Sequence, residues 1–142
     1  MTPQSRCWAE ISSSALRHNF AFLRSQLPHS VRSEEADAFG VANLTEAQAI
    51  AHLANERPIF ILSPALPEER PTIAKKGFIP FVSSQEEADH YAVFGSKVSP
   101  TEIHLTIDTG MGRIGIPAHH ALESLRTIAQ SPHLKITGIN SH

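Results

Sequence analysis

Patterns typical of strands and helices alternate about five times along this chain. Strand-like apolar runs fall at residues 36–43, 58–63, 78–83, 103–108 and 134–142, and amphipathic stretches lie between them. This alternation favours a parallel sheet, because each parallel neighbour needs a crossover connection, which is usually a helix. A closed (β/α)8 barrel takes roughly 250 residues, whereas this chain has 142. The sequence therefore predicts an α/β fold, either an open sheet or a partial (β/α)8 TIM-type barrel of about five to six parallel strands with flanking helices.

Capping residues and prolines predict where the helices begin and end. Ser14 is expected to cap a first helix that continues to Pro28, and Thr45 is expected to cap a second one. A short helix should end at Gly77, and Ser84 begins a capping motif with Glu87. The last helix is expected to start near Pro117, since proline suits the first helical position.

Composition limits the classes of protein to consider. Hydrophobic residues make up 41% of the chain, which is typical of a globular domain, and we expect one domain over residues 1–142. The formal charge is -2, with 12 basic and 14 acidic residues, so no basic surface for nucleic acid or an anionic membrane is predicted. Cys7 is the only cysteine, which favours a reducing compartment. With no apolar run approaching the ~18 residues of a membrane span, we expect a cytoplasmic protein.

The strand at residues 103–108 leads into a glycine-rich loop with one arginine. Its side chains alternate: three are apolar, and His104, Thr106 and Asp108 form the polar face. The loop that follows, residues 109–115, reads Thr-Gly-Met-Gly-Arg-Ile-Gly and places Arg113 just beyond the carboxyl end of the strand. Ligands of parallel α/β proteins bind at that end. We therefore expect Asp108 to reach a cavity and Arg113 to lie at its mouth.

Two other interpretations of this loop have to be weighed. Residues 110–115 match G-x-G-x-x-G, the dinucleotide-binding turn, but that motif needs a helix that starts near its second glycine. Pro117 disfavours helical dihedrals at Ile116, and the strand at residues 134–142 has no acid for a ribose. Residues 108–110, Asp-Thr-Gly, also match the catalytic triplet of aspartic proteases, which are all-β proteins, whereas this chain alternates helix and strand.

The stretch at residues 104–115, His-Leu-Thr-Ile-Asp-Thr-Gly-Met-Gly-Arg-Ile-Gly, resembles a motif of the alanine racemases. These enzymes interconvert L- and D-alanine with pyridoxal 5'-phosphate (PLP), a step in D-alanine biosynthesis for the cell wall. Residues 6–19 are similar to the opening of that family, and further similar blocks follow in the family's order at residues 36–47, 61–63, 82–84 and 138–142. Because the family has a complete barrel followed by a β domain, the resemblance implies that this chain corresponds to the earlier portion of the barrel.

The same resemblance implies that the main catalytic groups of the family are missing. In the family, a lysine within a motif close to V-V-K-A-N-A-Y-G-H-G holds PLP as a Schiff base. Here, residues 28–35 join the first helix directly to the block at residues 36–47, as if some two dozen family positions were deleted. The second base of the family, a tyrosine, comes from the later β domain across a dimer interface. We therefore expect no covalent attachment of PLP and no racemisation by this chain alone.

A smaller set of site residues carries over from the resemblance. Arg113 matches the family arginine beside the phenolic oxygen of the cofactor and the carboxylate of the substrate, and His142 matches a histidine packed near the PLP ring. Asp108 matches the acid at the start of the glycine loop, where its simpler role is a cap. Thr106 departs from the family, since many members have there a lysine that helps position the arginine. Asp108 is then the remaining nearby candidate to orient Arg113.

Nine histidines raise the question of a metal site, which we do not expect. His119 and His120 are adjacent, so their side chains leave a helix about 100° apart and do not readily chelate one ion. The sequence thus predicts an alanine racemase-like chain, inactive alone, whose family ligand is a small amino acid. Two alternatives are a non-catalytic binding or assembly module, which pairs with a full-length racemase or forms a homodimer through exposed sheet edges, and a non-functional gene fragment.

Overall fold

The computed structural model describes residues 12–26 and 37–141. The chain divides into two compact units, Met1–Ala36 and Asp37–His142, and each is described by itself. The expectation of one domain over residues 1–142 stays a prediction. Cys7, Pro28 and His142 lie outside the described residues.

The first unit contains the helix α1 (Ser13–Gln26). The amide of Ala15 donates a hydrogen bond to Ser12 Oγ at 3.2 Å. The predicted cap at Ser14 is therefore wrong by two residues, since the chain offers three consecutive serines and the first of them takes this position.

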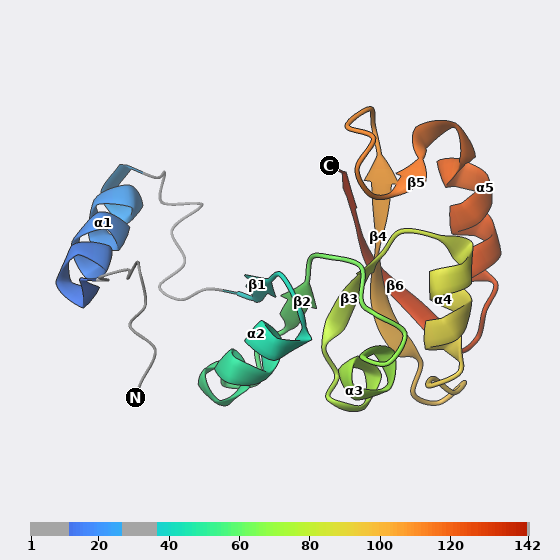
Figure 1. Cartoon of the computed structure of the whole chain (residues 1–142), viewed down its shortest axis with the longest axis horizontal. Helices are drawn as coiled ribbons and strands as arrows, with labels where there is room; N and C mark the ends of the chain where they lie inside the picture. The colour runs from blue at the N-terminus through green and yellow to red at the C-terminus, as the bar shows by residue number, and fades with distance from the viewer. Residues whose placement is uncertain (1–11, 27–36, 142) are drawn as a thin grey trace, which may run out of the picture. The chain divides into compact units, whose positions relative to one another are not determined.

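The second unit contains a sheet of six strands, all parallel (Figure 1). The strands follow the order β1-β2-β3-β4-β5, and β6 also pairs with β4. The strands are β1 (Phe39–Val41), β2 (Ile59–Ile61), β3 (Ile79–Val82), β4 (Thr101–Asp108), β5 (Ile116–Pro117) and β6 (Leu134–Ser141). The predicted fold class, a partial α/β barrel of five to six parallel strands, is confirmed.

Helices connect successive strands, as the alternating pattern predicts, except between β4 and β5, which a loop joins. They are α2 (Leu44–Ile50) with the 3-10 turn η2 (Ala51–Leu53), α3 (Arg70–Lys75), α4 (Gln85–Ala92) and α5 (Ala118–Ala129). The cap of α2 is Asn43, not the predicted Thr45, because Asn43 Oδ1 accepts a hydrogen bond from the amide of Glu46 at 3.0 Å. Ser84 caps α4 as predicted. No helix of the described residues is long and apolar enough to cross a bilayer.

The core lies between the sheet and the helices. On β4, Ile103 and Leu105 are fully buried in this core, and Ile107 packs at its edge, so the predicted apolar face of the strand is confirmed. Other strands and helices contribute to the same cluster: Ile59, Ile61, Ile73, Val82, Ala88, Tyr91 and Ile128. The opposite face of β4 carries His104, Thr106 and Asp108.

A β-bulge interrupts the pairing of β4 with β6. Ile103 pairs with Ile136, but His104 pairs with Gly138, so Thr137 is an extra residue on β6. Its hydroxyl donates a hydrogen bond to the Ile103 carbonyl at 3.3 Å. The bulge shifts the remaining residues of β6 by one position relative to β4.

The ring of His104 lies over Gly138 on the inner face of the sheet. A Cβ added to Gly138 would overlap this ring, so a glycine is required for the observed packing. The ring stacks on Phe81 with centroids 5.3 Å apart and planes 8° apart, and it also contacts Phe60. Burial lowers the pKa of His104, although Glu102 acts in the opposite direction. His104 is therefore part of an apolar floor in the barrel interior.

Candidate functional site

A cavity of about 690 Å³ lies at the carboxyl ends of the strands. The end of β1 and the segment after β2 form one wall, and Phe81 of β3 also borders it. The rest of the lining includes Arg113 and Ile114 of the glycine loop and Asn140 and Ser141 of β6. This is the edge of the sheet at which parallel α/β proteins bind ligands. The structure thus brings Arg113 together with polar side chains from distant segments.

The glycine loop is held by the carboxylate of Asp108. The amide of Gly110 donates to Oδ1 at 2.9 Å, and the amide of Gly112 donates to both oxygens at 3.1 Å. Gly110 and Gly112 have φ values of 135° and 70°, a region that favours glycine. Asp108 does not line the cavity, contrary to the expectation that it would reach one. The strand ends in a turn whose amides draw its carboxylate into the loop.

Gly115 brings the end of the loop back against β4. Its φ is 114°, and a Cβ at this position would lie 2.6 Å from the amide nitrogen of Asp108. The next residue, Ile116, then pairs with Ile107 in the short strand β5. The loop is therefore anchored at both ends, and Arg113 lies between the two anchors.

This geometry argues against the dinucleotide and protease interpretations. The helix α5 begins at Ala118, beyond the last glycine, so no helix N-terminus lies within the motif. The amides that would bind a pyrophosphate in such a motif instead donate to Asp108. An aspartic protease is excluded because its fold is all-β, whereas this sheet is parallel and alternates with helices.

Thr106 and Asn140 form a polar bridge between β4 and β6. Thr106 is fully buried, and its Oγ1 donates a hydrogen bond to Asn140 Oδ1 at 3.2 Å. Asn140 in turn lines the cavity with Arg113. Threonine has no charge with which to orient a guanidinium, and the hydroxyl of Thr106 instead hydrogen-bonds the side-chain amide of Asn140.

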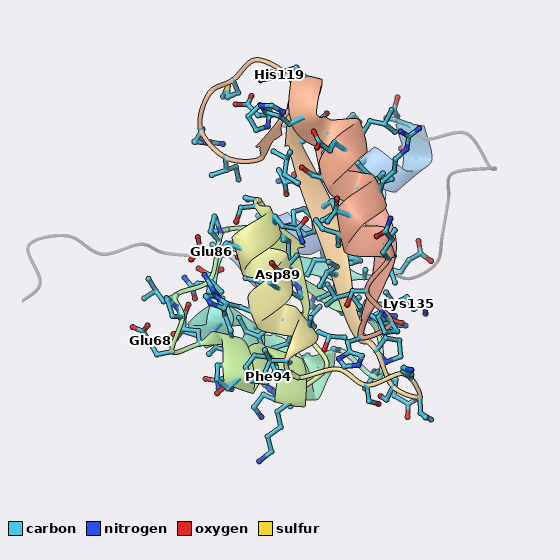
Figure 2. The ribbon with its side chains drawn as sticks, turned by 90° about the vertical axis from the view of Figure 1, so that its right-hand side faces the viewer. Glu68, Glu86, Asp89, Phe94, His119 and Lys135 are labelled. Carbon is cyan, nitrogen blue, oxygen red and sulfur yellow. The ribbon has the colours of Figure 1, made fainter. Side chains whose placement is uncertain are left out.

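The four lysines of the chain all belong to the described residues, and none lines the cavity. Lys75 and Lys76 lie at the carboxyl end of α3, where cations are favoured by the helix dipole, and Lys97 lies in a loop. Lys135 is the second residue of β6 and forms an ion pair with Glu102 at 2.6 Å. Figure 2 shows Lys135 at the other end of α5 from His119. No lysine is therefore placed to form an imine with a ligand in the cavity.

The remaining predictions about the site concern His142 and the absence of a metal site. His142 lies outside the described residues, so its predicted position near the ligand remains a prediction. Within the described part of the chain, no three histidine, cysteine or acidic side chains form a group that could hold a metal ion. His119 and His120 contact each other, with ring centroids 4.2 Å apart.

Several residues of the cavity were not singled out from the sequence. Asn140 and Ser141 end β6, Ser63 follows β2, and Glu46 lies in the first turn of α2. The first three share a position, since each ends a strand of the parallel sheet or closely follows one. A search for polar residues at strand ends would have found Ser63, Asn140 and Ser141. Glu46 would have been missed, because it lies in the first turn of a helix; in the structure its carboxylate accepts a hydrogen bond from the amide of Ala42 at 2.8 Å.

Comparisons with known sequences identify the relatives of this chain. The family model "Alanine racemase, N-terminal domain" matches residues 29–142. The alanine racemase of Geobacter sp. (strain M21) is 32% identical over 158 residues, which cover 94% of this chain and 42% of that protein. The alanine racemase of Citrifermentans bemidjiense is 34% identical over the same shares of the two chains. The chain thus spans about 42% of the length of these curated relatives.

Solved structures show the same fold. The alanine racemase of Clostridium difficile 630 superposes with a TM-score of 0.81, at 20% identity, over 98% of this chain and 45% of that one. The alanine racemase of E. faecalis superposes with a TM-score of 0.67, at 28% identity, over 75% of this chain and 30% of that one. Together with the match of the family model over most of the chain, these similarities show that the chain belongs to the alanine racemase family, in the region of its N-terminal domain.

Proposed function

We propose that the chain is an alanine racemase-like barrel module that does not racemise alanine by itself. The family reaction is the PLP-dependent interconversion of L- and D-alanine. The observation that carries the proposal is the lining of the cavity: it contains Arg113 but none of the four lysines. A guanidinium is suited to bind a carboxylate or a phenolic oxygen, whereas covalent attachment of PLP needs an amine. The chain therefore keeps a binding group of the family site and lacks its covalent anchor.

The alignments support the loss of an internal segment. The match to the Geobacter racemase covers 158 residues of alignment but takes in only 94% of this 142-residue chain, or about 133 residues. About 25 aligned positions of the relative therefore have no counterpart here, which agrees with a deleted strand and helix before β1. Since PLP supplies an electron sink only after it forms an imine, the residues present do not fit covalent PLP chemistry.

The proposal predicts that PLP does not label one lysine stoichiometrically. Purified chain is mixed with PLP, reduced with borohydride and digested, and pyridoxyl-lysine is mapped by mass spectrometry while D-alanine is assayed in parallel. We expect only scattered, substoichiometric labelling and no D-alanine, because none of the four lysines lines the cavity that contains Arg113. An intact alanine racemase provides the positive control. A single stoichiometric adduct together with D-alanine production would refute the proposal.

The open edges of the sheet favour an assembly module as a second candidate. Among the described residues, β1 pairs only with β2, and β6 pairs only with β4, so each has an edge with unpaired backbone groups. Such edges can pair with another chain. If this candidate is correct, mixing the chain with a full-length racemase and measuring mass by light scattering after gel filtration gives a complex, or the chain alone gives a dimer. If the chain is a monomer and forms no complex with the racemase, the assembly module is ruled out.

A further inference from the structure

A buried polar cluster lies between α3 and α4, outside the set of residues that line the Arg113 cavity. Glu87 is only 5% exposed and Tyr91 is fully buried. The two are four residues apart on α4, so their side chains share one face of the helix. Buried carboxylates are uncommon in proteins unless they are paired, so Glu87 calls for a physical explanation.

The hydrogen bonds of this cluster are incomplete. Glu87 Oε2 accepts a hydrogen bond from the amide of Ser83 at 2.9 Å, which completes the N-terminal cap of α4. Within the described residues, however, neither Glu87 Oε1 nor the hydroxyl of Tyr91 has a hydrogen-bond partner. A buried oxygen without a partner loses its hydration without replacement. The interface therefore contains two groups that would each gain from the entry of water.

Charged groups face the cluster from both helices. Arg70 of α3 faces Glu87, donates a hydrogen bond through Nε to the Ala65 carbonyl at 3.3 Å, and contacts Nδ1 of His90 through Nη1. His90 faces Glu87 from α4 itself, and Glu69 faces Tyr91.

Burial has the largest effect on the carboxyl group of Glu87. It raises the pKa of Glu87 above its usual value, whereas the Ser83 amide, Arg70, the Ala65 amide and His90 act to lower it. The net direction is upward, because the loss of hydration outweighs the combined effect of these four groups on the pKa. Ionisation of this side chain is thus easier when the interface is hydrated than when it is packed.

The cluster contacts the segment that continues from one wall of the cavity. Residues 62–69 form the segment between β2 and α3, and the first three of them, Leu62, Ser63 and Pro64, line the cavity that contains Arg113. Ala65 follows directly, is buried, and is held by Arg70 through its carbonyl. The position of this segment therefore depends on the packing around Glu87.

We propose that Glu87 is a positioning residue for this wall: in its neutral form it keeps residues 62–69 packed against α4, and on ionisation it admits water and loosens them. A group with a higher pKa in the packed state favours that state at low pH, and the contribution is lost as the pH rises through the folded-state pKa. The segment should thus be better protected at pH 5 than at pH 8. The consequence for ligands rests on the proposed function, but the movement of the segment does not.

The test is amide hydrogen exchange of residues 62–69 in the full chain at pH 5 and pH 8, corrected for intrinsic exchange. The amides of Leu66 and Glu69 report directly, since both form hydrogen bonds within the segment. Wild type is compared with Glu87→Gln, which is permanently neutral and nearly isosteric. The matched control is Glu86→Gln, which removes the same charge from the exposed neighbour labelled on α4 in Figure 2.

We expect wild type and Glu86→Gln to lose at least about fivefold in protection between pH 5 and pH 8, the effect of one unsatisfied buried group, and Glu87→Gln to lose none. Equal pH dependence in all three proteins would overturn the proposal. If Glu87→Gln does not fold, the carboxyl carbon of Glu87 is titrated by NMR in wild type, and a midpoint at or below about 4.3 also overturns it. Equilibrium binding of PLP, with the same variants, separates the two ideas: absent binding by wild type at both pH values counts against the proposed ligand site only.

Discussion

Replacement of Gly115 by alanine is expected to destabilise the second unit by about 3 kcal/mol or more, the upper range for a residue forced into a forbidden backbone conformation. The φ of Gly115 is 114°, and the added Cβ would lie 2.6 Å from the Asp108 amide nitrogen and 2.9 Å from the Ile107 carbonyl carbon. Both contacts are with backbone of the central strand, which cannot rotate away. Urea unfolding followed by circular dichroism measures the loss. The same variant should displace Arg113, because the loop loses one of its two anchors.

The matched control is Gly112→Ala in the same loop. Gly112 also has a positive φ, 70°, but no atom lies within 4 Å of the position of its Cβ. Only the left-handed conformation then opposes the substitution, so a loss of about 1 kcal/mol is expected. Equal losses for the two variants would mean that the close approach of Gly115 to β4 does not contribute to stability.

Leu105→Ala is expected to cost about 2–5 kcal/mol, the usual range for removal of a buried leucine side chain. Leu105 is fully buried in the centre of β4, and this strand pairs with β3 on one side and β6 on the other. Single domains are stable by only about 5–15 kcal/mol, so the variant should lose a large part of its free energy of unfolding. The midpoint of urea unfolding, compared with wild type, gives the measurement.

Leu122→Ala provides the comparison for that loss. Leu122 lies on α5 and is 61% exposed, so its truncation should change stability by no more than about 0.5 kcal/mol. A small effect of Leu105→Ala, close to that of Leu122→Ala, would show that the sheet and helices do not form a packed core in solution.

The order and type of the main elements could be predicted from the sequence because apolar residues repeat with different periods in helices and in strands. Strict alternation along residues 103–108 indicated a strand with one buried face, and Ile103 and Leu105 are indeed in the core. The continuous apolar run at residues 58–63 indicated a strand of a parallel sheet, which is β2. The sequence also predicts Ser84 as a cap, because Glu87 follows it at the spacing of a capping motif, and the structure confirms it.

The caps of α1 and α2 were predicted at the wrong residues because several neighbouring residues could serve as caps. Two of three consecutive serines precede Ser14, and Asn43 precedes Thr45 by two residues, so sequence alone offers several acceptable caps. The strand β5 has only two residues and forms because Gly115 turns the chain back against β4, which no local pattern encodes.

The candidate site could be located but not completed from the sequence. Arg113 follows a strand that the sequence pattern predicts, so its position at the carboxyl edge of the parallel sheet could be predicted too. The capping of Gly110 and Gly112 by Asp108 was not, because a carboxylate at a strand end can point either into a cavity or back to the chain. Asn140 lies far along the sequence, and its approach to Arg113 results from the pairing of β6 with β4.

The extra residue Thr137 decides the chemical character of the cavity. In uninterrupted pairing, Ile139 would lie opposite Thr106 and present a hydrocarbon to any bound molecule, while Asn140 would turn to the outer surface. With the insertion, the amide faces inward and the isoleucine is 58% exposed. The polarity of this wall is thus set by how many residues separate Ile136 from Asn140. In a family of such barrels, the gain or loss of a single codon in this strand would exchange a polar side chain for an apolar one at the cavity wall without any substitution elsewhere in the strand.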